Sequence, residues 1–226
     1  MLKTLLMSSA LLLSATTIAC SRAAASVIAI PDPAIDETLR TTSATQTIVL
    51  AGGCFWGVDA VFKHVKGVTD VKSGYAGGKA DVSYEEVSTG RTGYAESVQI
   101  TYDPSKITYG KLLKVFFAVA HDPTEINRQG PDTGTQYRSA IFYSTDEQQR
   151  IAQAYIDQLN KAKVFRAPLA TQLTRLDTFH EAEGYHQNYL ATHTDEPYIV
   201  YNDLPKLENL RKEFPELYQE AGLSKR

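Results

Sequence analysis

The chain has 226 residues, of which 43% are hydrophobic and 22% charged, and its formal net charge at pH 7 is −3. A slightly negative chain offers no electrostatic basis for binding nucleic acid. About 180 residues follow position 45, enough for one domain with a full hydrophobic core.

The first 25 residues have the pattern of a secretory signal peptide. Lys3 gives a positive start, residues 5–18 are apolar and small, and small residues follow as far as Ala25. The apolar run is too short, and too often interrupted by Ser and Thr, to predict a membrane-spanning helix. Cleavage after Ala25 would remove Cys20, whereas cleavage before Cys20, at a partial lipobox, would leave it lipidated. We therefore expect an exported, periplasmic protein, anchored to the membrane if Cys20 is lipidated.

Residues 26–45 are rich in Ala, Thr, Ser and Pro without a period, which predicts a flexible N-terminal arm. Either processing route leaves Cys54 as the single free thiol of the mature chain. A mature chain with one cysteine has no internal disulfide to support its fold. The presence of a single thiol in an exported protein therefore needs another explanation, and catalysis is the obvious one.

Cys54 stands where a strand is predicted to pass into a helix. Residues 47–51 read as a short buried strand, Gly52-Gly53 as a sharp turn, and the apolar residues from Phe55 onward follow a helical period. Free N–H groups in a first helical turn favour a thiolate, the nucleophilic form of cysteine. The alternative is a small buried filler, but the flanking glycines and the Phe55-Trp56 pair favour a reactive site with an apolar wall.

The remaining pattern predicts one α+β domain in which helices pack on a mixed sheet. Four further segments have the pattern of strands: residues 68–73, 95–102, 137–143 and 172–176. Helices are predicted from Thr108, from a Thr145–Gln148 capping box to about Lys163, over residues 181–190, and from Pro205 to Pro215. Residues 121–136 are predicted to form a polar loop.

Glu96 has the same parity as Val98, Ile100 and Tyr102 in the strand over residues 95–102. Period-2 alternation therefore places its carboxyl group on the apolar face, where desolvation favours the protonated acid. The alternative is a glutamate at the end of a strand that bends out to water. Two loops rich in hydrogen-bond donors, residues 84–95 and 129–139, favour a functional site.

Four motifs in this order resemble the A-type peptide-methionine sulfoxide reductases: GCFWG at residues 53–57, YEEVSTGRTGYAESVQITYDP at 84–104, QGPDTGTQYRSAIFY at 129–143, and GYHQNYL at 184–190. The resemblance covers residues 46–204, the expected catalytic domain, and leaves residues 205–226 as a C-terminal helix and tail. It implies a single-domain ferredoxin-like α/β roll.

The resemblance also implies the chemistry. Cys54 would attack the sulfur of a methionine-S-sulfoxide, protein-bound or free, and Glu96 would protonate its oxygen, since a sulfoxide is a poor electrophile until its oxygen is protonated or strongly hydrogen-bonded. The products would be methionine and a sulfenic acid on Cys54. Phe55 and Trp56 would hold the S-methyl group of the substrate. Tyr84 and Tyr137 would donate hydrogen bonds to the sulfoxide oxygen, and Asp132 would organise the site.

Several positions depart from the family pattern. Tyr94 stands where many relatives have His, and Pro131, which has no backbone donor, stands where many have Asn. Ser88 stands where some relatives carry Cys, and residues 192–226 contain no recycling cysteine. The resemblance therefore implies that an outside thiol, either a small thiol or a thioredoxin- or glutaredoxin-like protein, reduces Cys54. We expect a monomer whose other partners are oxidised proteins and peptides.

No cofactor or metal is expected. His180, Glu181 and His186 miss the spacing of a zinc-binding HExxH motif, and the resemblance implies that His186 supports the site. Two other functions remain open at this point: another cysteine enzyme, such as a thiol peroxidase or an acyl-transfer enzyme, and an exported binding lipoprotein without turnover. A hydrolase would require a His base near Cys54, and no such pattern is evident.

Overall fold

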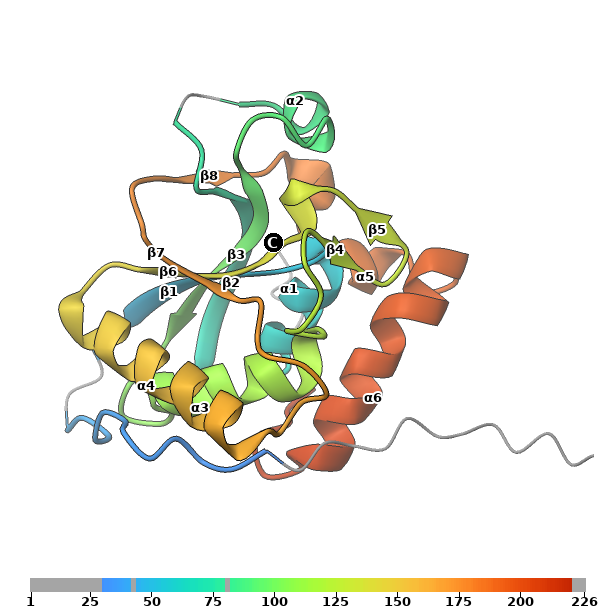
Figure 1. Cartoon of the computed structure of the whole chain (residues 1–226). Helices are drawn as coiled ribbons and strands as arrows, with labels where there is room; N and C mark the ends of the chain where they lie inside the picture. Colours follow the sequence, from blue (N-terminus) through green and yellow to red (C-terminus); the bar gives the residue numbers. More distant parts are fainter. Residues whose placement is uncertain (1–29, 42–43, 80–81, 221–226) are drawn as a thin grey trace, which may run out of the picture.

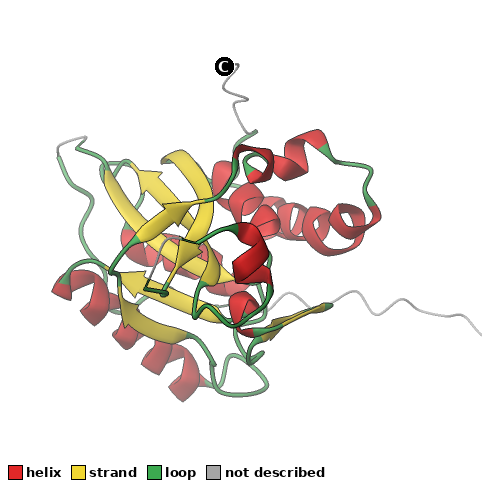
Figure 2. Ribbon diagram, turned by 90° about the horizontal axis from the view of Figure 1, so that it is seen from above, coloured by secondary structure: helices red, strands yellow, loops and turns green. Residues whose placement is uncertain are grey.

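A computed structural model describes residues 30–41, 44–79 and 82–220. Its main sheet is mixed, with the strand order β7-β6-β1-β3-β2-β8, and only the β6–β7 pair is parallel. The strands span Gln46–Gly52 (β1), Val68–Ala76 (β2), Ala95–Tyr102 (β3), Ser139–Tyr143 (β6), Gln172–Arg175 (β7) and Phe179–Glu181 (β8). The sheet is curled and has helices packed outside it (Figures 1 and 2). The predicted fold class, one domain with a mixed sheet and helices, is confirmed.

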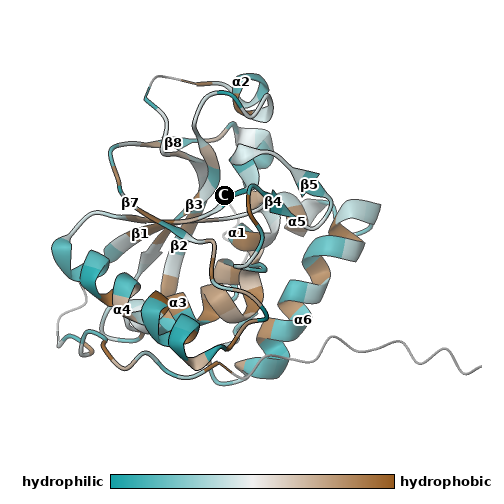
Figure 3. Cartoon of the chain, in the orientation of Figure 1, coloured by the Kyte–Doolittle hydropathy of each residue, from teal (hydrophilic) through white to brown (hydrophobic). Residues whose placement is uncertain are grey.

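The principal hydrophobic core lies between one face of this sheet and its helices. The helices that contribute are α1 (Phe55–Lys63), α3 (Tyr109–Val115), α4 (Asp146–Ala162) and α6 (Leu204–Glu213). Val98, Ile100 and Tyr102 of β3 point into this core, whereas Ala95 belongs to a smaller cluster on the opposite face. Hydrophilic residues line the outer sides of α4 and α6 (Figure 3). The alternation predicted for β3 is therefore confirmed.

Some predicted elements differ from those observed. Residues 181–190 were expected to be helical, but they contain the end of β8, a 3-10 turn at Gly184–His186 and the start of the short α5 (Tyr189–Thr192). The left-handed backbone of Asn188, with φ 57°, interrupts the segment. Thr145 caps α4 through the Gln148 N–H, but the Gln148 side chain accepts from Ser144, so only half of the predicted capping box forms.

The two donor-rich loops also contain regular structure. The loop at residues 84–95 begins with a one-turn helix, α2 (Tyr84–Ser88), which a Ser83–Glu86 capping box starts. The second donor-rich loop, residues 129–139, overlaps the predicted polar loop at residues 121–136, and the chain forms a small hairpin there from β4 (Arg128–Gln129) and β5 (Asp132–Thr133). Beyond α3 the chain continues as a π-helical turn, η1 (Phe116–Ala120).

Residues 30–41, expected to belong to a flexible arm, pack against the domain. Asp36 accepts the backbone N–H of Gly110 at 2.8 Å and Glu37 accepts that of Tyr109 at 2.9 Å. Two carboxylates thus meet the positive N-terminal end of α3. Ile30 is buried in the main core. A composition without a period does not reveal such capping contacts, because they depend on a helix far along the chain.

Within residues 30–41, 44–79 and 82–220, no helix is both long and apolar enough to cross a membrane. The expected signal peptide and Cys20 lie outside the described residues.

Candidate active site

Cys54 occupies the N-cap position of α1, directly after β1. Gly53 makes the turn with φ 88°, and a Cβ atom at this position would overlap the side chain of Gln129. The turn therefore brings the polar loop against the start of α1. The Cys54 side chain is buried, with 8% of the residue exposed. The predicted passage from strand through glycine turn to helix is present as expected.

The thiol itself is not a resting thiolate. Burial raises the pKa of Cys54 well above its ordinary value, and the negative charges of Glu96 and Asp203 raise it further. The backbone N–H of Trp56 and the ammonium group of Lys206 act in the opposite direction but are smaller effects. The predicted effect of the first-turn N–H groups is present and favours the thiolate, but the net shift is upward, because desolvation outweighs one turn of helix.

Glu96 is buried on β3, where it pairs with Tyr75 of β2, and only 2% of its surface is exposed. Its Oε2 accepts the backbone N–H of Phe55 at 3.1 Å, which fixes the carboxyl group at the first turn of α1. Burial raises the pKa of Glu96 to about 8, although the hydrogen bond from Phe55 opposes this shift. A neutral carboxylic acid at pH 7 thus lies beside Cys54, as the strand alternation predicted.

Tyr84, Tyr137 and Asp132 come from three separate segments and meet around this pair. Tyr84 is the first residue of α2, Tyr137 ends a 3-10 turn after β5, and Asp132 lies in β5. Burial, with the nearby charges of Glu96 and Cys54, raises the pKa of Tyr84 to about 12 and also raises that of Tyr137. Both phenols therefore keep their protons and can donate hydrogen bonds to an oxygen in the site.

Phe55 and Trp56 form an aromatic wall that neighbouring rings hold in place. Trp56 Nε1 donates to His186 Nδ1 at 3.2 Å, and the indole stacks on Tyr189 with 3.7 Å between ring centroids. Phe55 is buried, and its ring lies 5.0 Å from that of His186. Burial lowers the pKa of His186, so the imidazole is neutral and can accept the indole proton.

The structure brings further residues to the site that the sequence analysis did not identify. The Tyr198 hydroxyl donates to Asp132 Oδ2, which accounts for the position of that carboxylate. Glu183 accepts both the Tyr75 hydroxyl and the Tyr84 backbone N–H, at 2.8 and 3.0 Å. Glu183 directly precedes the fourth motif and Tyr198 lies several residues beyond its end, so the motif itself indicated neither of them.

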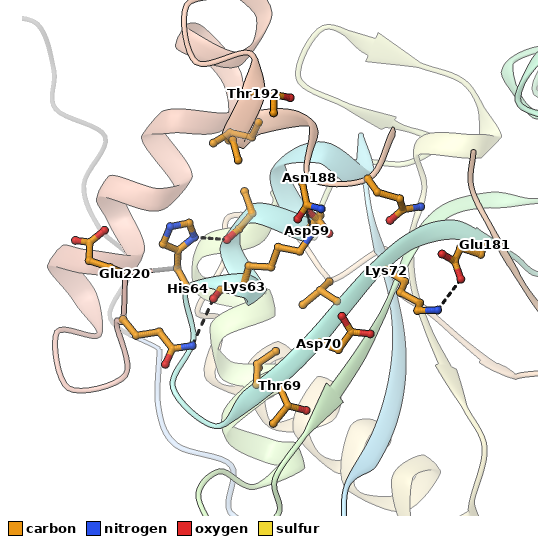
Figure 4. Close-up of a pocket in the computed structure, with 17 residues that line it drawn as sticks. Asp59, Lys63, His64, Thr69, Asp70, Lys72, Glu181, Asn188, Thr192 and Glu220 are labelled. Atoms are coloured by element: carbon orange, nitrogen blue, oxygen red, sulfur yellow. Dashed lines mark hydrogen bonds and ion pairs between the residues drawn. The ribbon is translucent and has the colours of Figure 1, made fainter. Parts of the chain in front are cut away.

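A separate groove of about 1290 Å³ runs along α1 and β2 (Figure 4). Its lining includes Asp59, His64 and Lys72 but neither Cys54 nor Glu96, so it is not the reaction site. In the described parts of the chain, no group of three or more His, Cys, Asp or Glu residues is placed to hold a metal ion.

Comparison with known proteins agrees with this geometry. Residues 46–218 match the family model described as peptide methionine sulfoxide reductase. The chain is 59% identical over 182 residues to peptide methionine sulfoxide reductase MsrA 2 of Mesorhizobium japonicum, covering 80% of this chain and 93% of the relative.

Two solved structures are similar. Mxr1 from Saccharomyces cerevisiae in reduced form has a TM-score of 0.61 and 34% identity, covering 71% of this chain and 91% of its own. Methionine sulfoxide reductase A of Corynebacterium diphtheriae has a TM-score of 0.58 and 37% identity, covering 74% and 84%. The chain belongs to the peptide methionine sulfoxide reductase family, and it is an oxidoreductase that reduces methionine sulfoxide to methionine.

Proposed function

We propose that this chain reduces methionine-S-sulfoxide with Cys54 as the nucleophile and Glu96 as the acid. The observation that carries the proposal is the hydrogen bond from the Phe55 N–H to Glu96. Because Phe55 directly follows Cys54, this bond holds a buried neutral acid close to the thiol. Proximity of this kind lets proton transfer and nucleophilic attack occur together.

In the proposed step, the Cys54 sulfur forms a bond to the sulfoxide sulfur while Glu96 donates a proton to the sulfoxide oxygen. The protonated oxygen then moves from the substrate sulfur to the Cys54 sulfur as the substrate S–O bond and the newly formed bond between the two sulfur atoms break, so that a thiol and a sulfoxide become a sulfenic acid and a thioether. Glu96 recovers the proton that the thiol gives up, and the atoms and electrons balance. Sulfur in the substrate is reduced and sulfur in Cys54 is oxidised.

The site residues supply three functions in this scheme. Tyr84 and Tyr137, kept protonated by burial, donate hydrogen bonds to the sulfoxide oxygen as negative charge develops there. The S-methyl group packs on Phe55 and Trp56, whose orientation His186 and Tyr189 support. Asp132, hydrogen-bonded by Tyr198, orders the side of the site that faces the hairpin of β4 and β5.

We further propose that an external thiol regenerates the enzyme. Cys54 is the only cysteine among the described residues, and Ser88, which stands where some relatives carry Cys, donates its hydroxyl to Glu85. A small thiol or a thioredoxin- or glutaredoxin-like protein would attack the sulfenic acid and release water, leaving a mixed disulfide that a second thiol resolves.

A single-turnover experiment without reductant tests this proposal. We expect about one methionine per enzyme, a sulfenic-acid probe on the peptide that contains Cys54, and no intramolecular disulfide. Addition of dithiothreitol should restore turnover. A Cys20–Cys54 bridge in the mass spectrum of the oxidised enzyme would contradict recycling by an external thiol, and absence of the probe from Cys54 would contradict its role as nucleophile.

The cellular location proposed from residues 1–25 is the periplasm, with the chain anchored to the membrane if Cys20 is lipidated. The charged start, short apolar run and small residues of this segment support export. In that compartment the substrates would be exported proteins and peptides that carry methionine-S-sulfoxide.

A further inference from the structure

A buried ion pair lies beside the first turn of α1. Asp203 ends the π-helical turn η4 (Ile199–Asp203), and none of its surface is exposed. Lys206, the third residue of the following α6, places its Nζ 3.0 Å from Asp203 Oδ1, and only 16% of its side chain is exposed. The second oxygen of Asp203 has no hydrogen-bond partner. Burying such a pair is costly, because desolvation offsets much of the attraction between the charges and one carboxylate oxygen lacks a hydrogen bond.

Gly57 is what lets this pair approach α1. A Cβ atom at Gly57 would overlap Asp203 Oδ1 and lie 2.7 Å from Lys206 Nζ. Gly57 is the third residue of α1, so both charges sit against the helical turn that Cys54 caps. A glycine within a helix ordinarily lowers its stability, and here its missing side chain makes room for an ammonium group and a carboxylate.

We propose that Lys206 is a positioning residue that stabilises the anionic forms of Cys54, the thiolate before attack and the sulfenate after it, and that Asp203 holds the Lys206 ammonium group in place. This inference rests on the proposed function in that Cys54 is the nucleophile. The site needs such a cation because burial opposes ionisation of the thiol and the α1 N-terminus does not overcome it.

Other charged and titratable groups around Cys54 do not supply this cation. Glu96 on β3 and Asp203 on η4 interact with the thiol and are acids, as is Asp132 nearby on β5. The other groups with a charge interaction with the thiol are phenols: Tyr84, Tyr137, Tyr189 and Tyr198. His121, behind the turn at Gly52, is held neutral by burial, which lowers its pKa to about 3. Among the charged groups of the described residues that act on Cys54, Lys206 is the cation that lowers the pKa of the thiol, whereas its partner Asp203 raises that pKa by a larger amount.

The opposite signs of these two charges give a sharp test. The rate of Cys54 alkylation by iodoacetamide, followed against pH by peptide-resolved mass spectrometry of the full chain, reports the thiolate without any turnover. In Lys206→Met the midpoint should move to higher pH, and in Asp203→Asn to lower pH. A shift of half a pH unit corresponds to a roughly threefold change in rate below the midpoint.

Controls separate this effect from loss of structure. Lys206→Arg should stay near the wild-type midpoint, as should Lys212→Met, which removes an exposed lysine of the same helix. Partial unfolding would expose the thiol and lower the midpoint in both single variants, so a higher midpoint in Lys206→Met cannot come from it. Shifts in the same direction, or no shift in either variant, would overturn the inference, whereas a wild type without turnover on sulfoxide would instead refute the proposed function.

Discussion

Cys54→Ser is expected to abolish reduction of methionine sulfoxide, with a loss of at least about 1,000-fold. A serine hydroxyl in this buried position is a far weaker nucleophile, and His121, with its pKa lowered by burial, hydrogen-bonds Ser139 rather than serving as a base for residue 54. The measurement is release of methionine from a sulfoxide peptide with dithiothreitol in excess. The fold should remain, because serine is close to cysteine in size and its oxygen can still accept the backbone N–H of Trp56.

Cys20→Ser is the matched control for this loss. The same chemical change at the other cysteine of the chain should leave turnover intact, because Cys20 is not needed when an outside thiol reduces Cys54. Appreciable turnover by Cys54→Ser would refute the assignment of the nucleophile, and loss of recycling in Cys20→Ser would refute external reduction.

Glu96→Gln should lower turnover by about 100- to 1,000-fold, less than Cys54→Ser. An amide can hydrogen-bond the sulfoxide oxygen, but it cannot protonate it. Because the pKa of Glu96 is raised to about 8, the protonated acid predominates below that pH and is lost above it. Wild-type activity should therefore contain a component that falls through pH 8, and the loss in Glu96→Gln should shrink at lower pH, where solvent supplies protons.

Glu181→Gln provides the comparison for this variant, since Glu181 is an exposed glutamate that pairs with Lys72. It should retain the wild-type rate and pH profile. If the pH profile of Glu96→Gln has the same shape as that of the wild type, Glu96 only supports the structure.

Local patterns in the sequence predict much of this site. The passage from strand through Gly52-Gly53 to helix places Cys54 correctly, because a glycine turn and a helical period are local signals. Period-2 alternation places Glu96 in the core for the same reason. Tyr84, Tyr137 and Asp132 lie together only in the folded chain, and the family resemblance, not the pattern, suggested that they would.

What the sequence did not predict depends on distant contacts. No sequence pattern indicated Asp203, which occupies the N-cap position of α6 but makes no cap hydrogen bond and instead pairs with Lys206. The first-turn N–H groups favour the Cys54 thiolate as predicted, but the extent of burial, which cannot be read from the first turn alone, outweighs them and raises the pKa of the thiol. The helical expectation for residues 181–190 failed because Asn188 adopts a left-handed backbone.

Turnover on each epimer of methionine sulfoxide separately tests the central claim most directly. With the methyl group against Phe55 and Trp56 and the oxygen toward Glu96, Tyr84 and Tyr137, one epimer leaves its main chain pointing toward solvent. The account predicts that the S-sulfoxide is consumed and the R-sulfoxide remains, as measured by chiral separation of the unreacted substrate. Equal rates on the two epimers would contradict the assignment of the pocket, and no turnover on either would contradict the proposed reaction.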